Sequence, residues 1–221
     1  MKQTDKDRIT FLASLAKDSN TLLDVGCDHA LTTIKALKYF NVKYAIASDI
    51  NPGPLKMAKY NIIKEGLEQR CKIILSDGLK NINDDFDTLI ISGMGGLLIN
   101  KILSDSFDKI KNKKLIIQAN KERECVREYL SNNGFLIEDE YAFYDKDIYY
   151  EIMVFKNGTI KYNNDEILYG PCLIKDKNDA FKKYYKFKRD ILFSSLSKIK
   201  DKDILKKNKE LCDKYNSLIG E

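Results

Sequence analysis

The 221-residue chain, with 43% hydrophobic and 32% charged residues, is long enough for one medium-sized domain and a smaller appendage. Its polar N-terminus and lack of a long apolar run argue against a signal peptide and a membrane span. Five scattered cysteines and a single histidine argue against a disulfide framework and a structural metal site. We therefore expect a soluble cytoplasmic protein that binds no metal and keeps its thiols reduced.

Apolar runs alternate with helical patterns along the first two thirds of the chain. The expected strands are 20–26, 43–50, 71–78, 87–96 and 113–120. The expected helices between and after them are 29–40, 51–66, 97–105 and 122–134. This alternation predicts a parallel sheet whose two faces are both covered by helices.

Two further β-rich runs close this series within residues 135–158. Only a short YDKD turn separates them, so the second run must return antiparallel to the first. A parallel sheet that ends in an antiparallel hairpin resembles the Rossmann-like layout of class I S-adenosylmethionine-dependent methyltransferases, not that of dinucleotide dehydrogenases. The expected fold class is α/β, with a mostly parallel seven-stranded sheet.

The composition changes near residue 158, where a linker punctuated by Gly170-Pro171 begins. Two lysine-rich helical patterns follow, 178–200 and 203–220, and Asp201 or Asp203 can cap the second. Their apolar seams predict an antiparallel helical hairpin of coiled-coil type. The seams consist of Leu192, Leu196 and Ile199 on the first helix, and of Leu205, Cys212, Tyr215 and Ile219 on the second. We predict a sheet domain over residues 1–158, and a linker with this hairpin over residues 159–221.

The net charge of +5 comes from the C-terminal part of the chain. Residues 1–159 contain 23 basic and 23 acidic side chains, whereas residues 160–221 contain 15 basic and 10 acidic ones. A basic appendage on a neutral domain indicates a polyanionic partner, and a solvated helix face is the alternative.

Polar residues and glycines follow the first strand, at the sheet edge where open α/β folds bind their ligands. Asp24, Gly26, Cys27, Asp28 and His29 form a D-x-G-x-D loop that lacks the paired glycines of a pyrophosphate site. Its acids suit a ligand that carries an ammonium or a sulfonium group. An ordinary turn with capping acids is the alternative.

The next two strands also end in acids. Asp49 follows the first loop by roughly 20 residues, and its carboxylate can accept both hydroxyls of a ribose. After the third strand, Ser76, Asp77 and Gly78 can hold an exocyclic amine and allow close approach of a ligand. Helix capping by Asp49 and a plain turn at Asp77 are the alternatives.

The fourth and fifth strands end in glycines and amides. Gly93 and Gly95 flank Met94, and because glycines have no side chain a ligand can approach the backbone there. The Met94 side chain can pack on a flat ring of that ligand. Gln118 and Asn120 can reach a substrate or cap the following helix. Together, the strand ends describe an adenosine pocket with acids around a cationic amino-acid end. S-adenosylmethionine fits this description, whereas NAD lacks a site for its pyrophosphate.

The motifs LLDVGCDHALTTI, ASDINPGPLKMAKYNI, SDGL, ISGMGG and YYEI with YGP are similar to those of the bacterial TrmK family, tRNA (adenine-22-N1)-methyltransferases. The resemblance covers nearly the whole chain. It implies S-adenosylmethionine as methyl donor, adenine N1 of tRNA as acceptor and a C-terminal coiled-coil hairpin. The implied cofactor residues are Asp24, Gly26, Cys27, Asp28, His29, Asp49, Ile50, Asn51, Ser76, Asp77, Gly78, Gly93, Met94 and Gly95. Cys27 replaces an expected small hydroxyl residue, and Gln118-Ala119-Asn120 lacks an expected proline.

Adenine N1 has a free lone pair and carries no proton, so its methylation needs positioning rather than a strong base. Asp28 and His29 are the leading candidates to shape the target site, and Asn120 is a further candidate. The expected tRNA contacts are Lys182, Lys183, Lys186, Lys188 and Arg189. Tyr184, Tyr185 and Phe187 among them either stack on RNA or form the hairpin core.

We expect a monomer. The alternatives are a methyltransferase for another RNA, a protein or a small molecule, and a non-catalytic RNA-binding module with a relict cofactor pocket.

Overall fold

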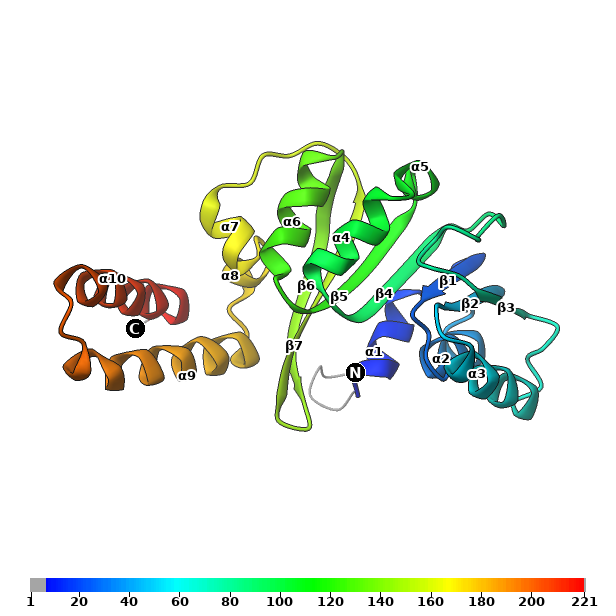
Figure 1. The fold of residues 1–221 in the computed structure, drawn as a ribbon, viewed down its shortest axis with the longest axis horizontal. Coiled ribbons are helices and arrows are strands. Elements are labelled where there is room, and N and C mark those ends of the chain that lie inside the picture. The colour runs from blue at the N-terminus through cyan, green and yellow to red at the C-terminus, as the bar shows by residue number, and fades with distance from the viewer. Residues whose placement is uncertain (1–6, 221) are drawn as a thin grey trace.

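The computed structural model describes residues 7–220, which contain one seven-stranded sheet in the order β3-β2-β1-β4-β5-β7-β6 (Figure 1). Its strands are β1 (Thr21–Val25), β2 (Tyr44–Asp49), β3 (Cys71–Leu75), β4 (Thr88–Gly95), β5 (Lys114–Lys121), β6 (Phe135–Asp145) and β7 (Ile148–Asn157). Strands β1 to β5 are parallel, while β7 runs antiparallel to both β5 and β6. The predicted fold class is confirmed.

Helices cover both faces of the sheet. Those of the sheet region are α1 (Arg8–Leu15), α2 (Leu31–Tyr39), α3 (Pro52–Lys64), α4 (Gly96–Ser104), α5 (Phe107–Ile110) and α6 (Arg123–Asn132). One hydrophobic core lies under α1, α2 and α3, and a second lies under α4, α5 and α6. Neighbouring strand residues such as Leu22 and Leu23 enter opposite cores, which explains the continuous apolar runs in the sequence.

Helix α1 was not predicted from the sequence. Asp7 caps it by accepting a hydrogen bond from the backbone N–H of Thr10 at 2.9 Å, and Phe11 and Leu12 are buried beneath it. The backbone N–H of Arg8 donates to Asp145 Oδ2 at 3.0 Å, so α1 is also attached to the end of β6. This helix therefore lies beside the carboxyl ends of the strands.

The C-terminal residues form the expected helical hairpin of α9 (Asp179–Ser195) and α10 (Lys202–Ile219). Asp201 caps α10, as one of two predicted alternatives. Helix α9 ends at Ser195 and continues as a short 3₁₀ turn, so the prediction of a helix to residue 200 was wrong. Leu196 and Ile199 consequently lie beyond the helix in the connection between α9 and α10.

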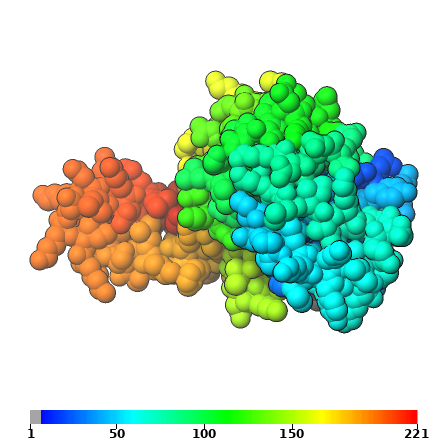
Figure 2. Space-filling model, turned by 45° about the vertical axis from the view of Figure 1, so that its right-hand side comes forward, coloured from blue at the N-terminus to red at the C-terminus, as the bar shows by residue number. Residues whose placement is uncertain are grey.

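The linker contains two short helices, α7 (Asn164–Tyr169) and α8 (Leu173–Asp176). A third hydrophobic core joins this linker and the base of the hairpin to β6 and β7. Within it, the rings of Tyr149 and Tyr184 stack with centroids 3.9 Å apart. In Figure 2 the hairpin forms a lobe that projects from the body of the molecule.

A buried ion cluster also holds the linker against the sheet. Arg127 on α6 donates to Glu140 on β6 and to Glu151 on β7, both at 2.7 Å, and all three side chains are almost fully buried. Arg127 also donates to the carbonyl of Ile167 in α7, and Glu140 accepts from the N–H of Cys172. Burial raises the pKa of the Glu140 carboxyl, and the charge of Arg127 offsets part of that rise.

Within residues 7–220, none of the helices combines the length and the apolar composition that crossing a membrane requires.

Candidate active site

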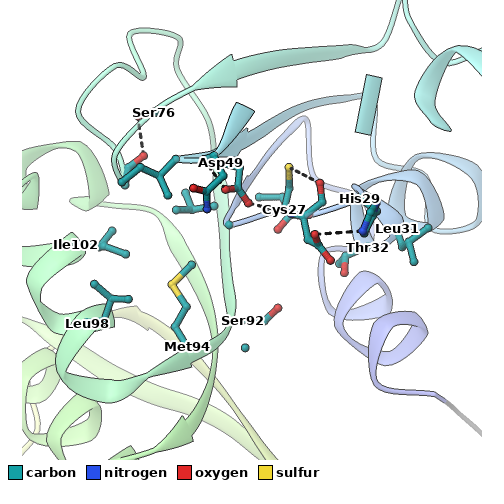
Figure 3. A pocket seen from close by; sticks show the side chains of 18 of the residues that line it. Cys27, His29, Leu31, Thr32, Asp49, Ser76, Ser92, Met94, Leu98 and Ile102 are labelled. Carbon is teal, nitrogen blue, oxygen red and sulfur yellow. Dashed lines mark hydrogen bonds and ion pairs between the residues drawn. The ribbon is translucent and has the colours of Figure 1, made fainter. Parts of the chain in front are cut away.

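A cavity of about 450 Å³ opens at the carboxyl ends of β1 to β4 (Figure 3). All the predicted cofactor residues except Gly95 line it, whereas Asn120 does not. The predicted residues that it brings together are Asp24, Gly26, Cys27, Asp28, His29, Asp49, Ile50, Asn51, Ser76, Asp77, Gly78, Gly93 and Met94. Arg8 and Ile9 of α1 also line the cavity, and sequence analysis missed both of them.

The loop after β1 comes close to the centre of the cavity. Gly26 has φ +73°, and a Cβ atom there would lie 2.2 Å from Met94 Cε. The N–H groups of Gly26 and Cys27 donate to the carbonyl of Ser48 at 2.8 and 2.9 Å, which fixes the loop to β2. Helix α2 begins at Leu31, two residues later than predicted, so Asp28 and His29 belong to the loop.

Asp24 is a buried acid at the end of β1. Its Oδ2 atom accepts a 2.7 Å hydrogen bond from Thr33 Oγ1. Burial raises the pKa of the Asp24 carboxyl to about 6, although the Thr33 hydrogen bonds lower it and nearby Asp49 raises it further. A cationic ligand beside this group would relieve the cost of its buried charge.

Asp49 connects the loops after β1 and β2. Its two carboxylate oxygens accept hydrogen bonds from the N–H of Asp28 at 3.2 Å and from that of Asn51 at 2.9 Å. Helix α3 has Asn51 as its N-cap and no side-chain cap, so Asp49 does not serve as the capping residue. Each carboxylate oxygen has a second lone pair, which leaves Asp49 able to accept from ligand hydroxyls.

Turn-forming contacts dominate the loop after β3. Ser76 Oγ donates to the carbonyl of Gly78 at 2.9 Å and accepts from the N–H of Asn81 at 3.1 Å. A Cβ atom on Gly78 would approach Ile102 to 2.9 Å, and its φ of +58° favours glycine as well. Asp77 is more than half exposed and pairs with Lys80, so its carboxylate lies at the cavity rim.

Two amide side chains of β5 form hydrogen bonds with the backbone N–H and carbonyl groups of Gly93. The buried Gln118 accepts at Oε1 from the N–H of Gly93 at 3.1 Å and from Arg8 Nη1 at 2.8 Å. Gln118 Nε2 donates to Asn120 Oδ1, and Asn120 Nδ2 donates to the carbonyl of Gly93 at 2.7 Å. Asn120 therefore influences the cavity through Gly93 rather than by facing it.

The glycines that follow Met94 have a packing role. A Cβ atom on Gly96 would lie 2.1 Å from the carbonyl oxygen of Glu122, and one on Gly95 would lie 3.2 Å from Lys121 Cε. These residues allow α4 to start close against β5. Met94 itself points into the cavity, between Leu98 and Ile102 on one side and Asp49 and Cys27 on the other (Figure 3).

Asp28 and His29 lie together at the mouth of the cavity. His29 Nε2 is 3.4 Å from Asp28 Oδ1, and the two side chains are 45% and 68% exposed respectively. Such exposure suits contact with a large substrate at the entrance. Burial raises the pKa of the neighbouring Cys27 thiol strongly, so Cys27 stays neutral and packs in the loop.

The predicted RNA-contacting residues divide into two groups. Lys182, Lys183, Lys186 and Lys188 are exposed on α9, whereas Arg189 donates to Asn216 Oδ1 of α10 at 2.9 Å and so helps to join the two helices. Among the aromatics, Tyr185 is buried and Phe187 is 61% exposed. The four lysines are thus accessible to solvent, although Lys183 and Lys188 also lie over the rings of Tyr144 and Tyr184.

A parallel sheet in this order, closed by one antiparallel strand, is characteristic of class I methyltransferases, and an acidic cavity without a pyrophosphate loop accords with their donor S-adenosylmethionine. The chain is therefore a Rossmann-like S-adenosylmethionine-dependent methyltransferase. Comparison with known families narrows this class: residues 22–221 match the model of the family TrmK, tRNA (adenine(22)-N(1))-methyltransferase. The chain belongs to this family.

Individual relatives agree with this result over nearly the whole chain. The tRNA (adenine(22)-N(1))-methyltransferase of Bacillus subtilis is 31% identical over 225 residues, which cover 96% of this chain and 94% of that protein. The crystal structure of Streptococcus pneumoniae Sp1610 has a TM-score of 0.88 at 30% identity, covering 96% and 97% of the two chains.

Two of the similar structures contain ligands. Sp1610 in complex with S-adenosyl-L-methionine has a TM-score of 0.86 at 29% identity, covering 95% of this chain and 98% of that one. TrmK of M. capricolum, in complex with the cofactor product S-adenosyl-homocysteine, has a TM-score of 0.82 at 28% identity, covering 96% and 95%.

Proposed function

We propose that this protein transfers the methyl group of S-adenosylmethionine to N1 of adenine 22 in tRNA. The observation that carries the proposal is the acidic, glycine-lined cavity at the strand ends, in a chain that belongs to this family. The activity needs a place for the donor, an entrance for one nucleotide and a surface for the rest of the RNA.

The residues of the cavity fit the donor. The lack of a Cβ atom at Gly26 and Gly78 lets Met94 and Ile102, which also line the cavity, pack close against the main chain. Asp49 would hold the ribose, with Ile50 and Asn51 beside it, and Asp24 would face the cationic methionyl end. The adenine would lie against Ser76, Asp77 and Gly78, and the methionyl group would lie along Gly93 and Met94, while Gly95 lies close to Lys121 at the start of α4.

Bound S-adenosylmethionine supplies an electrophilic methyl group. The chain has to place adenine N1 in line with that group and exclude water, because N1 already carries a lone pair. Asp28 and His29 would contact the target base at the mouth of the cavity. The Asp28 carboxylate would also stabilise the positive charge that the base acquires on methylation.

The target nucleotide has to be unpaired when it enters. Adenine N1 is the Watson–Crick acceptor, so a base-paired adenine hides the reacting atom. Extruding a base from a helix costs a few kcal/mol. Contacts between the hairpin and the tRNA backbone could offset this cost, and Lys182, Lys183, Lys186 and Lys188 are placed to make them. Arg189 would support these contacts by holding α9 to α10.

We also propose that the protein works as a monomer in the cytoplasm, with residues 1–158 as the methyltransferase domain and residues 159–221 as the RNA-binding appendage. One chain supplies all the cavity residues described above, so a partner subunit is not needed to complete the site. Light scattering on the protein, alone and with tRNA, tests this proposal. One protein per particle is the expected result, and a stable dimer would contradict it.

The decisive experiment uses unmodified tRNA with labelled S-adenosylmethionine, followed by mapping of methylated positions. We expect one N1-methyladenine per tRNA, at position 22, and none when that position is changed to guanine. Methylation at another position would refute the assigned nucleotide. Binding of the donor without transfer to tRNA would favour another substrate, and failure to bind the donor would favour a non-catalytic RNA-binding module.

A further inference from the structure

Helix α1 brings one positive charge to a cavity wall that is otherwise acidic. Among the described residues that line the cavity, Arg8 is the only lysine or arginine, and His29 is the only other side chain that can become cationic. The acids of the wall are Asp24, Asp28, Asp49 and Asp77. A single guanidinium among four carboxyl groups indicates a ligand with one anionic group and a cationic remainder.

The guanidinium of Arg8 is held in place. Its Nη1 atom donates to the buried Gln118 Oε1 at 2.8 Å, and its Cζ atom lies 5.3 Å from the centroid of the Tyr150 ring. The backbone N–H of Arg8 donates to Asp145, which fixes the start of the helix. The position of the group is therefore set before any ligand arrives, which lowers the entropic cost of binding.

Most of the hydrogen-bonding capacity of Arg8 remains available. An arginine side chain has five N–H donors, and Gln118 occupies one of them. No carboxylate within residues 7–220 forms an ion pair with the Arg8 side chain, although Asp145 binds its backbone. A guanidinium with spare donors matches the two oxygens of a carboxylate.

The order of the strands places Arg8 at one end of the proposed donor site. The residues proposed for the adenine follow β3, the ribose acid Asp49 is the last residue of β2, and the acidic loop follows β1. Gly93 lies near the end of β4, and Gln118, which holds Arg8, lies on the next strand, β5. Arg8 thus lies at the end opposite the adenine, where the amino-acid part of the donor has to be.

We propose that Arg8 binds the carboxylate of the methionyl group of S-adenosylmethionine, so that α1 completes the donor site. Asp24 and Arg8 then fix the orientation of the zwitterionic amino-acid end of the donor. Its ammonium group lies beside the buried Asp24, and its carboxylate lies beside the guanidinium of Arg8. This inference rests on the proposed function, because it assumes the same donor in the same cavity. It adds a residue and an element that the strand-end motifs do not contain.

The test compares two ligands by calorimetry: S-adenosylmethionine and its decarboxylated form, which lacks only the carboxylate. We expect the wild-type protein to bind the complete donor about tenfold or more tightly than the decarboxylated one. In Arg8→Met the ratio should fall to near one, because methionine keeps much of the apolar stem but no charge. In Arg8→Lys the ratio should be intermediate.

Lys35→Ala provides the matched control. Lys35 Nζ donates to Asp7 Oδ2 at 3.1 Å, so this cation also contacts the start of α1, but it does not line the cavity. The variant should keep the wild-type ratio. Because each ratio is measured on a single protein, partial unfolding of a variant lowers both affinities and leaves the comparison valid.

The outcomes separate this inference from the proposed function. A wild-type protein that binds neither ligand would contradict the donor site itself. A wild-type ratio in Arg8→Met would overturn the role of Arg8 alone. If donor binding is unchanged in that variant and KM for tRNA rises, Arg8 binds a phosphate of the RNA and the inference is wrong.

Discussion

Asp24 keeps a carboxyl group at a position that burial makes unfavourable for its charge. Its pKa of about 6 means that the carboxyl is mostly ionised at neutral pH, at a cost in folding free energy. A cation in the cavity would recover this cost on binding. Functional sites commonly retain such destabilising groups because their interactions are realised only with the ligand.

Asp24→Asn should stabilise the ligand-free protein in a pH-dependent way. The folded-state pKa lies above the ordinary aspartate value of 3.8, so the folded wild type binds more protons and loses stability as pH rises from about 4 to about 6. The amide can still accept from Thr33 and has no charge. At pH 7.5 the variant should gain up to about 3 kcal/mol in free energy of unfolding.

Urea denaturation at pH 7.5 and at pH 4 measures this effect. The gain should largely disappear at the lower pH, where the folded wild-type carboxyl is protonated and little of the pH-dependent loss has occurred. A difference that stays the same at both pH values would mean that the carboxyl does not titrate as described.

Asp28 differs from Asp24 because it is exposed at the mouth of the cavity. Asp28→Asn should lower kcat by about tenfold or more, since it removes a negative charge near the base that becomes cationic. Affinity for S-adenosylmethionine should change much less, because the backbone of residue 28 still donates to Asp49. Single-turnover kinetics and calorimetry measure the two effects, and equal losses in both would assign Asp28 to donor binding instead.

At the scale of elements, the attachment of the hairpin depends on buried charges. Arg127 donates hydrogen bonds to both buried carboxylates, Glu140 and Glu151. It also donates to the carbonyl of Ile167 in α7. Gly170 is required nearby, since a Cβ atom there would lie 2.6 Å from Glu140 Oε2. The linker, α6 and the closing strands of the sheet thus form one connected unit.

Arg127→Met should destabilise the protein by about 3–5 kcal/mol, because it leaves Glu140 buried without a cation and Glu151 with only the 3.7 Å ion pair to Arg123. Urea denaturation measures the loss. Lys156→Ala, which removes an exposed ion pair with Glu138, is the control and should cost about 1 kcal/mol or less. A similar small cost for both variants would show that water or another group compensates the buried acids.

The elements that sequence analysis recovered are those whose pattern is local. Alternating apolar runs predicted the sheet, and a missing helix in residues 135–158 predicted the antiparallel strand. Helix α1 also has a local sequence signal, the N-capping Asp7 followed by Thr10 and an apolar pair. The charged residues around Asp7 made this signal hard to recognise. The buried cluster was not predicted, because Arg127 resembles a surface residue until its partners are brought together by folding.

In the candidate site, too, sequence analysis found the residues that belong to local motifs. The acids and glycines stand directly after strands, so their meeting at one sheet edge followed from the topology. Arg8 could not be found in this way, because its partner Gln118 lies 110 residues further along the chain. Gly95 lies outside the cavity lining, and its closeness to Lys121 depends on the contact between β4 and β5, which a local motif does not show.

At the scale of the whole molecule, the sheet region and the hairpin carry different charges. The hairpin projects from the body as a lobe (Figure 2), and the exposed lysines lie within residues 182–188 of α9, where Lys183 Nζ is 4.5 Å from the centroid of the Tyr144 ring of β6. An RNA bound at the cavity mouth would contact this lobe through its phosphates, and such binding weakens steeply with salt.

Replacing Lys182, Lys183, Lys186 and Lys188 with glutamine should weaken tRNA binding and flatten its dependence on salt. Each lost phosphate contact reduces the slope of log K against log salt by about 0.7–0.9. The control replaces four exposed lysines of α10 and changes the net charge equally. These are Lys202, Lys206, Lys207 and Lys209. Titrations at several salt concentrations measure both slopes, and equal flattening by the control would mean that the hairpin acts only through its total charge.

The attachment of α1 to distant parts of the chain also affects when the protein becomes able to bind its donor. Arg8 contacts Gln118, 110 residues later, and its backbone contacts Asp145, 137 residues later. On the ribosome, the first helix therefore emerges long before its partners do. A nascent chain that ends at β4 contains the strand ends proposed to bind the nucleoside. It does not yet contain Gln118, the residue that holds the side chain of Arg8.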